Sequence, residues 1–304
     1  MWKRFAMSNT IVSPECKAKM IQDYLNGMTQ AQLAAQFGCA QTTCSKILKL
    51  AGVTTRSNGE THRKYQVEQS FFEVIDTEAK AYWLGFLTAD ATILDRGFVV
   101  ALNHSDMRHL EKLKAALGST HPIKMPSVSV RGKTYQTCNI FIGSNQLAAS
   151  LDSLGVTQHK SATCKPCQAI PEHLVVHYWR GVFDGDGFIC PNKGKKWIVG
   201  IVGTYDIAEG FRAFFSPLIT SHAQVCPHHN IFSIRFSGTT LSQMVLQHLY
   251  RGSTVYMDRK YKLYQELDSQ IAKSGQKFAC GASSTGVVGI QRETACDEAG
   301  TKVL

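Results

Sequence analysis

Residues 177–189 read HYWRGVFDGDGFI and join an apolar, helix-like run to two aspartates, Asp184 and Asp186, set between glycines. Gly181 and Gly185 fall one helical turn apart, although a glycine inside a helix costs about 1 kcal/mol relative to alanine. Residues at this spacing lie on the same face of a helix. The two glycines therefore predict a helix whose backbone approaches another segment very closely.

A weaker copy of this stretch, AYWLGFLTADA, lies upstream at residues 81–91. Gly85 and Ala89 take the places of the two glycines, and Asp90 takes the place of Asp186. Two copies of one motif at this separation indicate two copies of one fold unit.

The composition is that of an ordinary globular protein, with 304 residues, 44% of them hydrophobic and 18% charged. This length favours about two domains. The formal net charge of +10 favours a polyanionic partner. The sequence shows neither the N-terminal apolar region of a signal peptide nor an apolar run long enough to span a membrane. We therefore expect a cytoplasmic protein, not secreted and not membrane-bound, whose ten cysteines are reduced thiols.

Residues 1–65 are a candidate DNA-binding domain, with nine Lys and Arg residues against three acidic ones. Helical patterns cover residues 15–26, 29–37 and 41–50. Thr29 is placed to cap the second helix, and Gly38 to make a turn before the third. This pattern resembles a helix-turn-helix unit; a generic three-helix module that binds no DNA is the alternative. The first interpretation predicts that the third helix reads DNA through Gln41, Thr42, Thr43, Ser45 and Lys46.

The rest of the chain shows the order helix, two strands, helix, two strands, helix twice, in residues 66–170 and 171–268. Strand-like runs lie at residues 98–102, 128–142, 197–202 and 231–237, and amphipathic helical runs at 107–117, 145–154, 207–218 and 240–249. The pattern predicts an α+β fold of two pseudo-symmetric αββαββα repeats. Residues 269–304 are expected to form a flexible tail or the remnant of a small β-sheet DNA-binding domain.

The two motifs resemble those of the LAGLIDADG homing endonuclease family. Residues 179–187 match the nine-residue motif well, residues 83–91 match it loosely, and residues 256–261 are similar to the closing segment of the family. Thr88 and Ala91 depart from the usual Asp and Gly, but neither position carries the catalytic carboxylate. The resemblance implies a free-standing single-chain enzyme of two repeats, shaped as a saddle over the major groove. It also implies a mobile genetic element that acts as a monomer and cuts both strands of a long asymmetric DNA site.

The two aspartates are the candidate catalytic and metal-binding residues. Small residues are expected at the helix–helix interface, namely Gly85, Ala89, Gly181 and Gly185. Packing at these positions would bring Asp90 and Asp186 together at the two helix ends, where a cation is needed between them. Oxygen ligands with open water positions suit Mg²⁺, and two such ions could activate water and stabilise the leaving oxygen of a phosphodiester. The family resemblance implies that backbone carbonyls of Ala89 and Gly185 complete the metal ligands.

Basic and polar residues are expected to contact DNA. The resemblance implies that Lys160 and Lys260, which occupy corresponding places late in each repeat, reach the catalytic water and the phosphate. Outward-facing strand residues are expected to line the saddle, namely Ser129, Arg131, Lys133, Gln136, Asn139, Ser233 and Arg235. In the hairpin, Val128 and Val130 are expected on one face, and Ser127, Ser129 and Arg131 on the other.

Several other functions fit the sequence less well. A transcription regulator of the same fold would bind DNA without cutting it, and an intron RNA maturase would keep both fold and acids. Residues 184–187 begin like a calcium-binding EF-hand loop, but Phe188 and Ile189 occupy positions that need an oxygen ligand and a glycine. Cys164 and Cys167, with the residues CPHH at 226–229, are a weak candidate zinc site.

Overall fold

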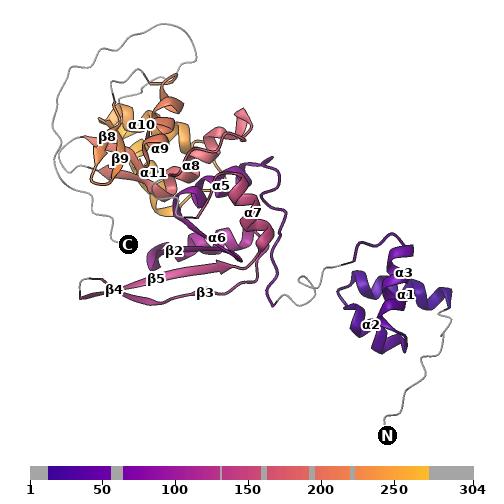
Figure 1. Cartoon of the computed structure of the whole chain (residues 1–304). Helices are drawn as coiled ribbons and strands as arrows, with labels where there is room; N and C mark the ends of the chain where they lie inside the picture. Colours follow the sequence, from indigo (N-terminus) through magenta and orange to yellow (C-terminus); the bar gives the residue numbers. More distant parts are fainter. Residues whose placement is uncertain are drawn as a thin grey trace. The chain divides into compact units, whose positions relative to one another are not determined.

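The structure is a computed structural model that describes residues 13–55, 64–130, 132–158, 163–191, 196–219 and 223–273 (Figure 1). The chain divides into two compact units, residues 1–65 and 66–304. Arg131, Lys160 and the tail from residue 274 onward lie outside the described residues. Residues 269–273, expected in that tail, belong instead to the last helix of the second unit.

The smaller unit consists of three short helices, α1 (Pro14–Leu25), α2 (Gln30–Phe37) and α3 (Gln41–Leu50), as the sequence predicts. Thr29 caps α2, and Gln32 bonds back to the Thr29 backbone, so two helix-end donors are satisfied reciprocally. Gly38 ends α2 with φ of 64°, a conformation that glycine adopts without steric cost. The apolar core of this unit consists of Met20, Tyr24, Leu33, Cys44, Ile47 and Leu48.

The larger unit is an α+β structure, as predicted. Its first half contains α5 (Glu78–Asp90), β1 (Ala91–Leu94), β2 (Gly97–Asn103), α6 (Met107–Ala116), β3 (Ile123–Lys124), β4 (Ser127–Val130), β5 (Lys133–Ile142) and α7 (Asn145–Ser153). Its second half contains α8 (Val175–Asp186), β6 (Gly187–Pro191), β7 (Trp197–Gly203), α9 (Tyr205–Phe215), β8 (Cys226–His228), β9 (Ile231–Ser237), α10 (Thr239–Tyr250) and α11 (Asp258–Lys273). Short 3-10 helices lie at His104–Asp106 and Glu172–Leu174.

Each half contributes one antiparallel sheet. The strand order is β1-β2-β5-β3 in the first sheet and β6-β7-β9-β8 in the second, and β4 pairs with β5 alone. In both sheets the first strand follows directly on the helix that carries the motif. The two sheets therefore place corresponding strands at corresponding positions relative to α5 and α8.

The β4–β5 hairpin is present where the sequence predicts it, and its register puts Val128 and Ser129 on opposite faces, as the alternation predicts. Val128 is exposed. β4 pairs with residues 133–136, whereas β2 pairs with residues 137–142, so the hairpin extends beyond the main sheet (Figure 1). An alternating sequence shows which side chains share a face, but it does not show whether the rest of the protein covers that face.

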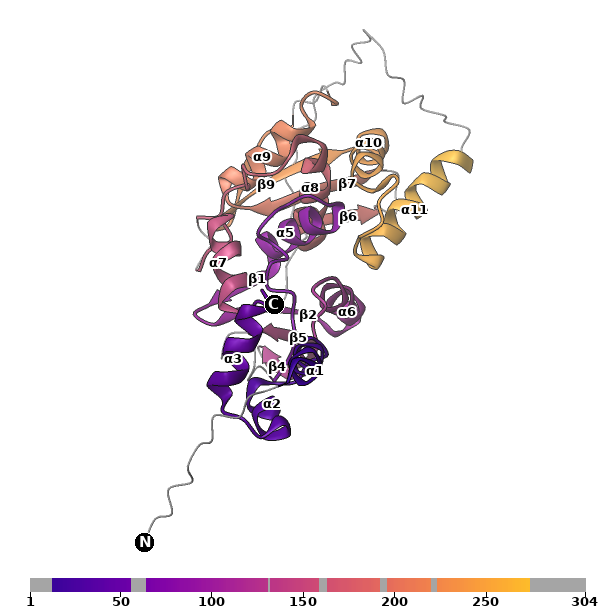
Figure 2. The same ribbon diagram turned by 90° about the vertical axis from the view of Figure 1, so that its right-hand side faces the viewer.

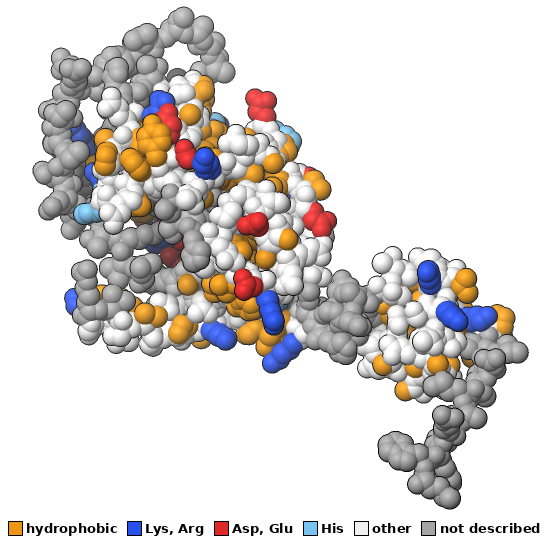
Figure 3. Space-filling view, in the orientation of Figure 1, with side chains coloured by type: hydrophobic (Ala, Val, Ile, Leu, Met, Phe, Trp, Pro, Cys, Tyr) orange, Lys and Arg blue, Asp and Glu red, His pale blue; other side chains and the backbone are white. Residues whose placement is uncertain are grey.

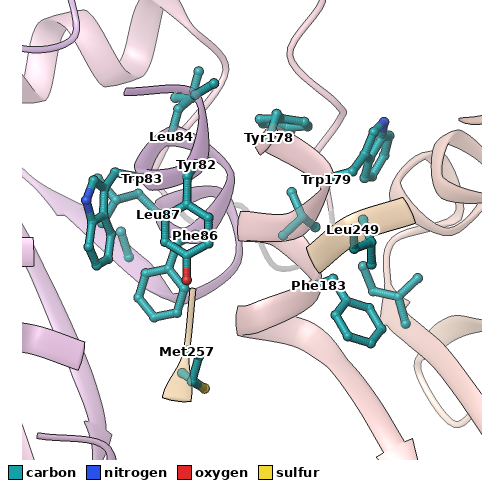
Figure 4. Packing of buried hydrophobic residues seen from close by; sticks show 14 of the residues in the cluster. Tyr82, Trp83, Leu84, Phe86, Leu87, Tyr178, Trp179, Phe183, Leu249 and Met257 are labelled. Carbon is teal, nitrogen blue, oxygen red and sulfur yellow. The ribbon is translucent and has the colours of Figure 1, made fainter. Parts of the chain in front are cut away.

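The core of the larger unit lies around α5 and α8, which are side by side between the two sheets (Figure 2). Tyr82 and Phe86 of α5, together with Tyr178 and Phe183 of α8, are fully or almost fully buried (Figure 4). Both helices carry apolar residues around most of their surface, as expected for helices surrounded by protein. Among the described residues, no helix is long and apolar enough to cross a membrane.

Candidate active site

Glycines allow α5 and α8 to pack backbone against backbone. A Cβ atom on Gly85 would overlap with the carbonyl oxygen of Tyr178, and one on Gly181 would overlap with the carbonyl oxygen of Tyr82. These obstacles are backbone atoms, which cannot move aside as a flexible side chain can. The two helices therefore approach as closely as they do only because both positions lack a side chain.

The same contact brings the two motif aspartates to one place. Asp90 is the last residue of α5, and Asp186 is the last residue of α8. A Cβ on Gly185 would lie 3.0 Å from Oδ2 of Asp90 and would overlap with the Cβ of Ala89, so the Asp90 carboxylate lies directly over the last turn of α8. Both aspartates line one cleft of about 530 Å³. Packing at the small residues thus places one carboxylate from each half of the protein in a shared cleft.

The electrostatics of this cleft favour a cation. The C-terminal ends of helices carry a partial negative charge, and here two such ends each add a carboxylate. Among the described residues, no three His, Cys, Asp or Glu side chains gather in a way that could hold a metal ion. The chain would therefore supply two carboxylates and nearby backbone carbonyls, such as those of Ala89 and Gly185. This partial set of hard oxygen ligands fits Mg²⁺, which usually keeps several waters when bound.

The weak zinc candidate is not supported. Cys164 and Cys167 do not form a ligand group with Cys226, His228 or His229 anywhere in the described part of the chain. The Cys164 thiol instead points to the carbonyl oxygen of Thr88, at 3.9 Å.

Asp184, the other acid of the motif, is completely buried rather than in the cleft. Its carboxylate accepts hydrogen bonds from the Tyr82 hydroxyl at 2.7 Å, from the backbone N–H of Met257 at 2.7 Å and from the Tyr250 hydroxyl. Burial raises the pKa of Asp184 above its ordinary value, although the charge of Lys260 and these donors act in the opposite direction. Asp184 is therefore a buried structural acid that joins α5, α8 and the segment before α11.

Lys260 lies beside this network, and its placement differs from the prediction. Its side chain is buried, with 2% exposure, and Nζ donates to the carbonyl oxygens of Phe183 at 2.6 Å, Asp184 at 2.9 Å and Gly187 at 2.5 Å. All three of these acceptors are main-chain oxygens at the C-terminal end of α8 or directly after it. The prediction that Lys260 reaches the phosphate does not agree with this arrangement. The ammonium instead caps the end of α8 on both sides of Asp186.

A second buried charge was not anticipated from the sequence. Arg180 of α8 has 1% exposure and donates to Glu78 of α5 at 2.6 Å, to the Val255 carbonyl at 2.9 Å and to the Leu249 carbonyl at 3.1 Å. An arginine among the apolar residues of 178–183 was the available signal, because a charge at such a position must find partners.

The predicted DNA contacts of the smaller unit lie on α3. Gln41, Thr42 and Lys46 are exposed, whereas Thr43 and Ser45 are partly buried. Cys44, Ile47 and Leu48, on the other side of the helix, fill the core. One face of α3 is therefore free of the packing within this unit.

On the first sheet, the predicted contacts divide between two faces. We call the side of each sheet that lines the cleft the cleft face; Val99 and Ala101 of β2 belong to it. Asn139 pairs with Ala101, so Asn139 and Lys133 are on the cleft face. Gln136 alternates to the opposite side, where it donates to Ser127 at 2.9 Å.

Ser129 shares that opposite side with Gln136, because Ser129 pairs with Thr134. Sequence alternation thus separates Ser129 and Gln136 from Lys133 and Asn139, and the four do not form one surface. Lys124, which pairs with Asn139 from β3, adds a basic residue to the cleft face that the sequence analysis missed. Lys and Arg side chains are spread along the edge formed by β3, β4 and β5 (Figure 3).

On the second sheet, Arg235 is exposed but Ser233 is buried, with 4% exposure. Ser233 pairs with Val202 on one side and with Cys226 on the other. The short hydroxyl side chain therefore lies among longer neighbours on its own face. The expectation that Ser233 is available to DNA is wrong for this reason.

Comparisons with known proteins give weak likenesses. No family model matches the chain, and no curated protein matches it. Among solved structures, the meganuclease I-SmaMI bound to uncleavable DNA is similar at 14% sequence identity and a TM-score of 0.46, over 64% of this chain and 91% of that one. Full-length DUF199/WhiA from Thermatoga maritima is similar at 15% identity and a TM-score of 0.42, over 67% of this chain and 64% of that one. At these scores, the function of the chain has to be inferred from its own cleft and motifs.

Proposed function

We propose that this protein is a site-specific endonuclease that hydrolyses both strands of a DNA duplex with the help of divalent metal, of which Mg²⁺ is the natural choice. One observation carries the proposal. The Gly-mediated contact of α5 and α8 places Asp90 and Asp186, the acids of two copies of one motif, in a single cleft. Two carboxylates at two negative helix ends supply hard oxygen ligands that a divalent cation would bind.

The residues in and around the cleft would have different roles. Asp90 and Asp186, with carbonyls of Ala89 and Gly185, would hold the metal. When bound, the metal would act as a Lewis acid and lower the pKa of a coordinated water. The buried contacts of Asp184 and Lys260 would keep the end of α8 in place. Lys160 remains our candidate for a direct contact with the phosphate.

Duplex DNA is the partner that best suits the charge and the two sheets. The net charge of +10 favours a polyanion, and basic residues such as Lys124, Lys133 and Arg235 lie on the cleft faces. Because both aspartates come from one chain, a monomer would suffice, and two non-identical sheets would read an asymmetric site. The smaller unit would add affinity as a helix-turn-helix through the exposed face of α3.

Two other functions of the same fold compete with this proposal. A transcription regulator would need DNA binding but no metal, so both acids in one cleft would have no purpose. A maturase would bind a folded intron RNA through the same surfaces. It would differ from the nuclease in its substrate, which is RNA instead of duplex DNA. Cleavage, specific binding without cleavage, and preference for RNA are therefore three distinct outcomes of one experiment.

The experiment incubates the full-length chain with Mg²⁺ and a library of duplex sequences, and then sequences the DNA ends. We expect one family of sites cut in both strands, with no cutting in EDTA. Asp90→Asn and Asp186→Asn should each lower cutting at least about a hundredfold, while DNA affinity stays within about tenfold. Asp152→Asn, an exposed acid on α7, is the matched control and should cut normally.

Metal binding is measured separately by calorimetry with Mg²⁺ or Mn²⁺ on the free protein. Each of the two aspartate variants should weaken it, and the Asp152→Asn control should not. Sequence-specific DNA binding without any metal-dependent cut would overturn the nuclease proposal in favour of a regulator. Tighter binding to structured RNA than to every duplex in the library would favour the maturase.

A further inference from the structure

The two sheets can be aligned residue by residue, starting from the aspartates. Ala91, which follows Asp90, pairs with Val100, and Val100 in turn pairs with Ile140. In the second sheet, the corresponding chain of pairs runs from Gly187 to Ile201 and on to Ile234. Ile140 and Ile234 therefore occupy corresponding positions, and so do the residues that follow them, Phe141 and Arg235.

Phe141 is an unusual residue for its position. Its strand neighbours Ile140 and Ile142 are completely buried, whereas Phe141 has 43% exposure on the cleft face. It pairs with Val99, a residue of the cleft wall. Phe141 therefore presents part of an apolar ring beside the cleft, where an apolar group of a bound ligand would pack against it.

Arg235 has the opposite character at the corresponding place. It is exposed and pairs with Gly200. Within the described residues, the guanidinium of Arg235 takes part in no hydrogen bond or ion pair. Its five donors are thus available to a ligand.

We propose that these two residues give the two halves of the DNA site opposite base chemistry at corresponding positions. Arg235 would donate to O6 and N7 of a guanine in the major groove, the commonest specific contact of arginine with DNA. Phe141 would pack against the C5-methyl group of a thymine, the apolar group that this groove presents. This inference rests on the proposed binding of duplex DNA to the cleft faces.

The inference makes a geometric prediction about the target. Because Phe141 and Arg235 are at matching register from Asp90 and Asp186, the thymine and the guanine should lie equally far from the centre of the cut, in opposite half-sites. A protein with two identical sheets would not give this result, because identical sheets would select identical bases in the two half-sites.

The test uses the full-length Asp186→Asn chain, so that DNA is bound without being cut. A binding selection from a duplex library identifies the preferred site, and single positions are then substituted. Replacing the thymine by deoxyuridine removes only the methyl group and should weaken binding about fourfold, from about 0.8 kcal/mol for one buried methyl. Replacing the guanine by adenine should weaken binding about tenfold or more, because a bidentate contact discriminates by about 1–3 kcal/mol.

Side-chain variants on the same background assign each base to its residue. Phe141→Ala should bind thymine and deoxyuridine sites equally, whereas Phe141→Leu, which keeps an apolar side chain, should retain part of the preference. Arg235→Ala should lose the preference for guanine and keep the preference for thymine. Met244→Ala, a residue of α10 with 38% exposure, and Arg251→Ala, after α10, are the controls and should leave both preferences unchanged. Melting temperatures of all variants show whether folding is preserved.

The possible failures are distinguishable. If the chain binds a specific duplex but discriminates neither thymine from deoxyuridine through Phe141 nor guanine through Arg235, the inference is wrong and the proposed function stands. If the chain binds no duplex at all, both are wrong. The inference would also be overturned if Phe141→Ala lost the preference for guanine or Arg235→Ala lost the preference for thymine. Bases at unequal distances from the centre of the cut would overturn it as well.

Discussion

The hydroxyl of Tyr82 on α5 donates a hydrogen bond of 2.7 Å to the buried carboxylate of Asp184 on α8. This bond crosses between the two halves of the larger unit. In α5, Thr88 takes the place that Asp184 has in α8, and its hydroxyl donates to the carbonyl of Leu84 in its own helix at 2.8 Å. The two motif helices are therefore alike at their glycines but carry different polar side chains two residues before their final aspartates.

Tyr82→Phe tests the contribution of this bridge. The variant keeps the ring but leaves Oδ2 of Asp184 with one donor fewer and removes the partner of His109 Nε2. Because both groups are buried, we expect a loss of about 1–3 kcal/mol in the free energy of unfolding. Urea unfolding measures it. Tyr205→Phe, which removes an exposed hydroxyl on α9, is the control; an equal effect in both variants would contradict the role of the bridge.

Glu78→Gln tests the buried Arg180. The Glu78 carboxylate accepts from Arg180 at 2.6 Å and from the backbone N–H groups of Thr254 at 2.8 Å and Val255 at 3.3 Å. Removing its charge leaves a buried guanidinium without its counter-ion, which costs about 3–5 kcal/mol for a fully buried pair. Glu78 itself is partly exposed, so we expect the lower end of this range. Glu209→Gln breaks a similar Glu–Arg pair on the surface of α9 and should leave the free energy of unfolding unchanged.

The same pair sets a pH dependence. Burial raises the pKa of Glu78, but the backbone N–H of Thr254 and the charge of Arg180 outweigh it, so the pKa lies below the ordinary 4.5. A carboxyl whose pKa is lower in the folded protein stabilises the fold above its unfolded-state pKa and loses this contribution as the pH falls. The stability difference between the wild type and Glu78→Gln should therefore be constant near neutral pH and shrink below about pH 4.5. A difference that grows on acidification would contradict this assignment.

Gly85→Ala tests the helix–helix contact directly. In a helix exposed to solvent, this change would stabilise by about 1 kcal/mol. Here the new methyl would overlap with the backbone of Tyr178, so we expect a loss of more than about 3 kcal/mol or failure to fold. Thermal unfolding followed by circular dichroism measures the change.

Gly210→Ala is the matched control for that variant. Gly210 also lies in a helix, α9, but its Cβ would meet only side-chain atoms, at 2.8 Å from Pro166 and 3.0 Å from Trp179. The proline ring and the buried indole must move by a few tenths of an ångström, so we expect a loss of stability here too, but a smaller one than for the overlap of Gly85→Ala with backbone. A Gly85→Ala protein as stable as Gly210→Ala would show that α5 and α8 do not pack backbone to backbone.

The sequence was informative where local spacing determines structure. Gly85 and Gly181, repeated at the same place in two motifs, were sufficient to predict a close helix–helix contact and a shared site for the aspartates that follow. Ser233 shows the limit of this approach. Alternation placed it on the cleft face, but burial there depends on Val202 and Cys226, which come from strands distant in sequence. Such neighbours are fixed by sheet register, which one sequence does not reveal.

Lys260 shows a second limit. Its place late in the second repeat corresponds to that of Lys160 in the first, and the family resemblance therefore implied a phosphate contact. Its actual partners are main-chain carbonyls, and these carry no sequence signal, since every residue has one. The same holds for Arg180, two of whose acceptors are backbone carbonyls.

Lys260→Met distinguishes the two roles. If the ammonium serves the end of α8, the variant leaves three carbonyls without their donor and the buried Asp184 without a nearby positive charge. We then expect a loss of about 3 kcal/mol in the free energy of unfolding, together with weaker metal binding. Lys262→Met, which removes an exposed lysine of the same helix, should change neither.

A double variant separates a charge effect from simple loss of packing. Asp184→Asn alone leaves the Lys260 ammonium without its buried counter-charge, and Lys260→Met alone leaves the carboxylate without its own. In the double variant both charges are gone, so its loss of stability should be smaller than the sum of the two single losses by about 0.5–3 kcal/mol. Strictly additive losses would mean that the two charges do not interact. The opposite result would be a Lys260→Met protein with normal stability and normal metal affinity that binds DNA but does not cut it. That result would support a direct contact of Lys260 with the phosphate.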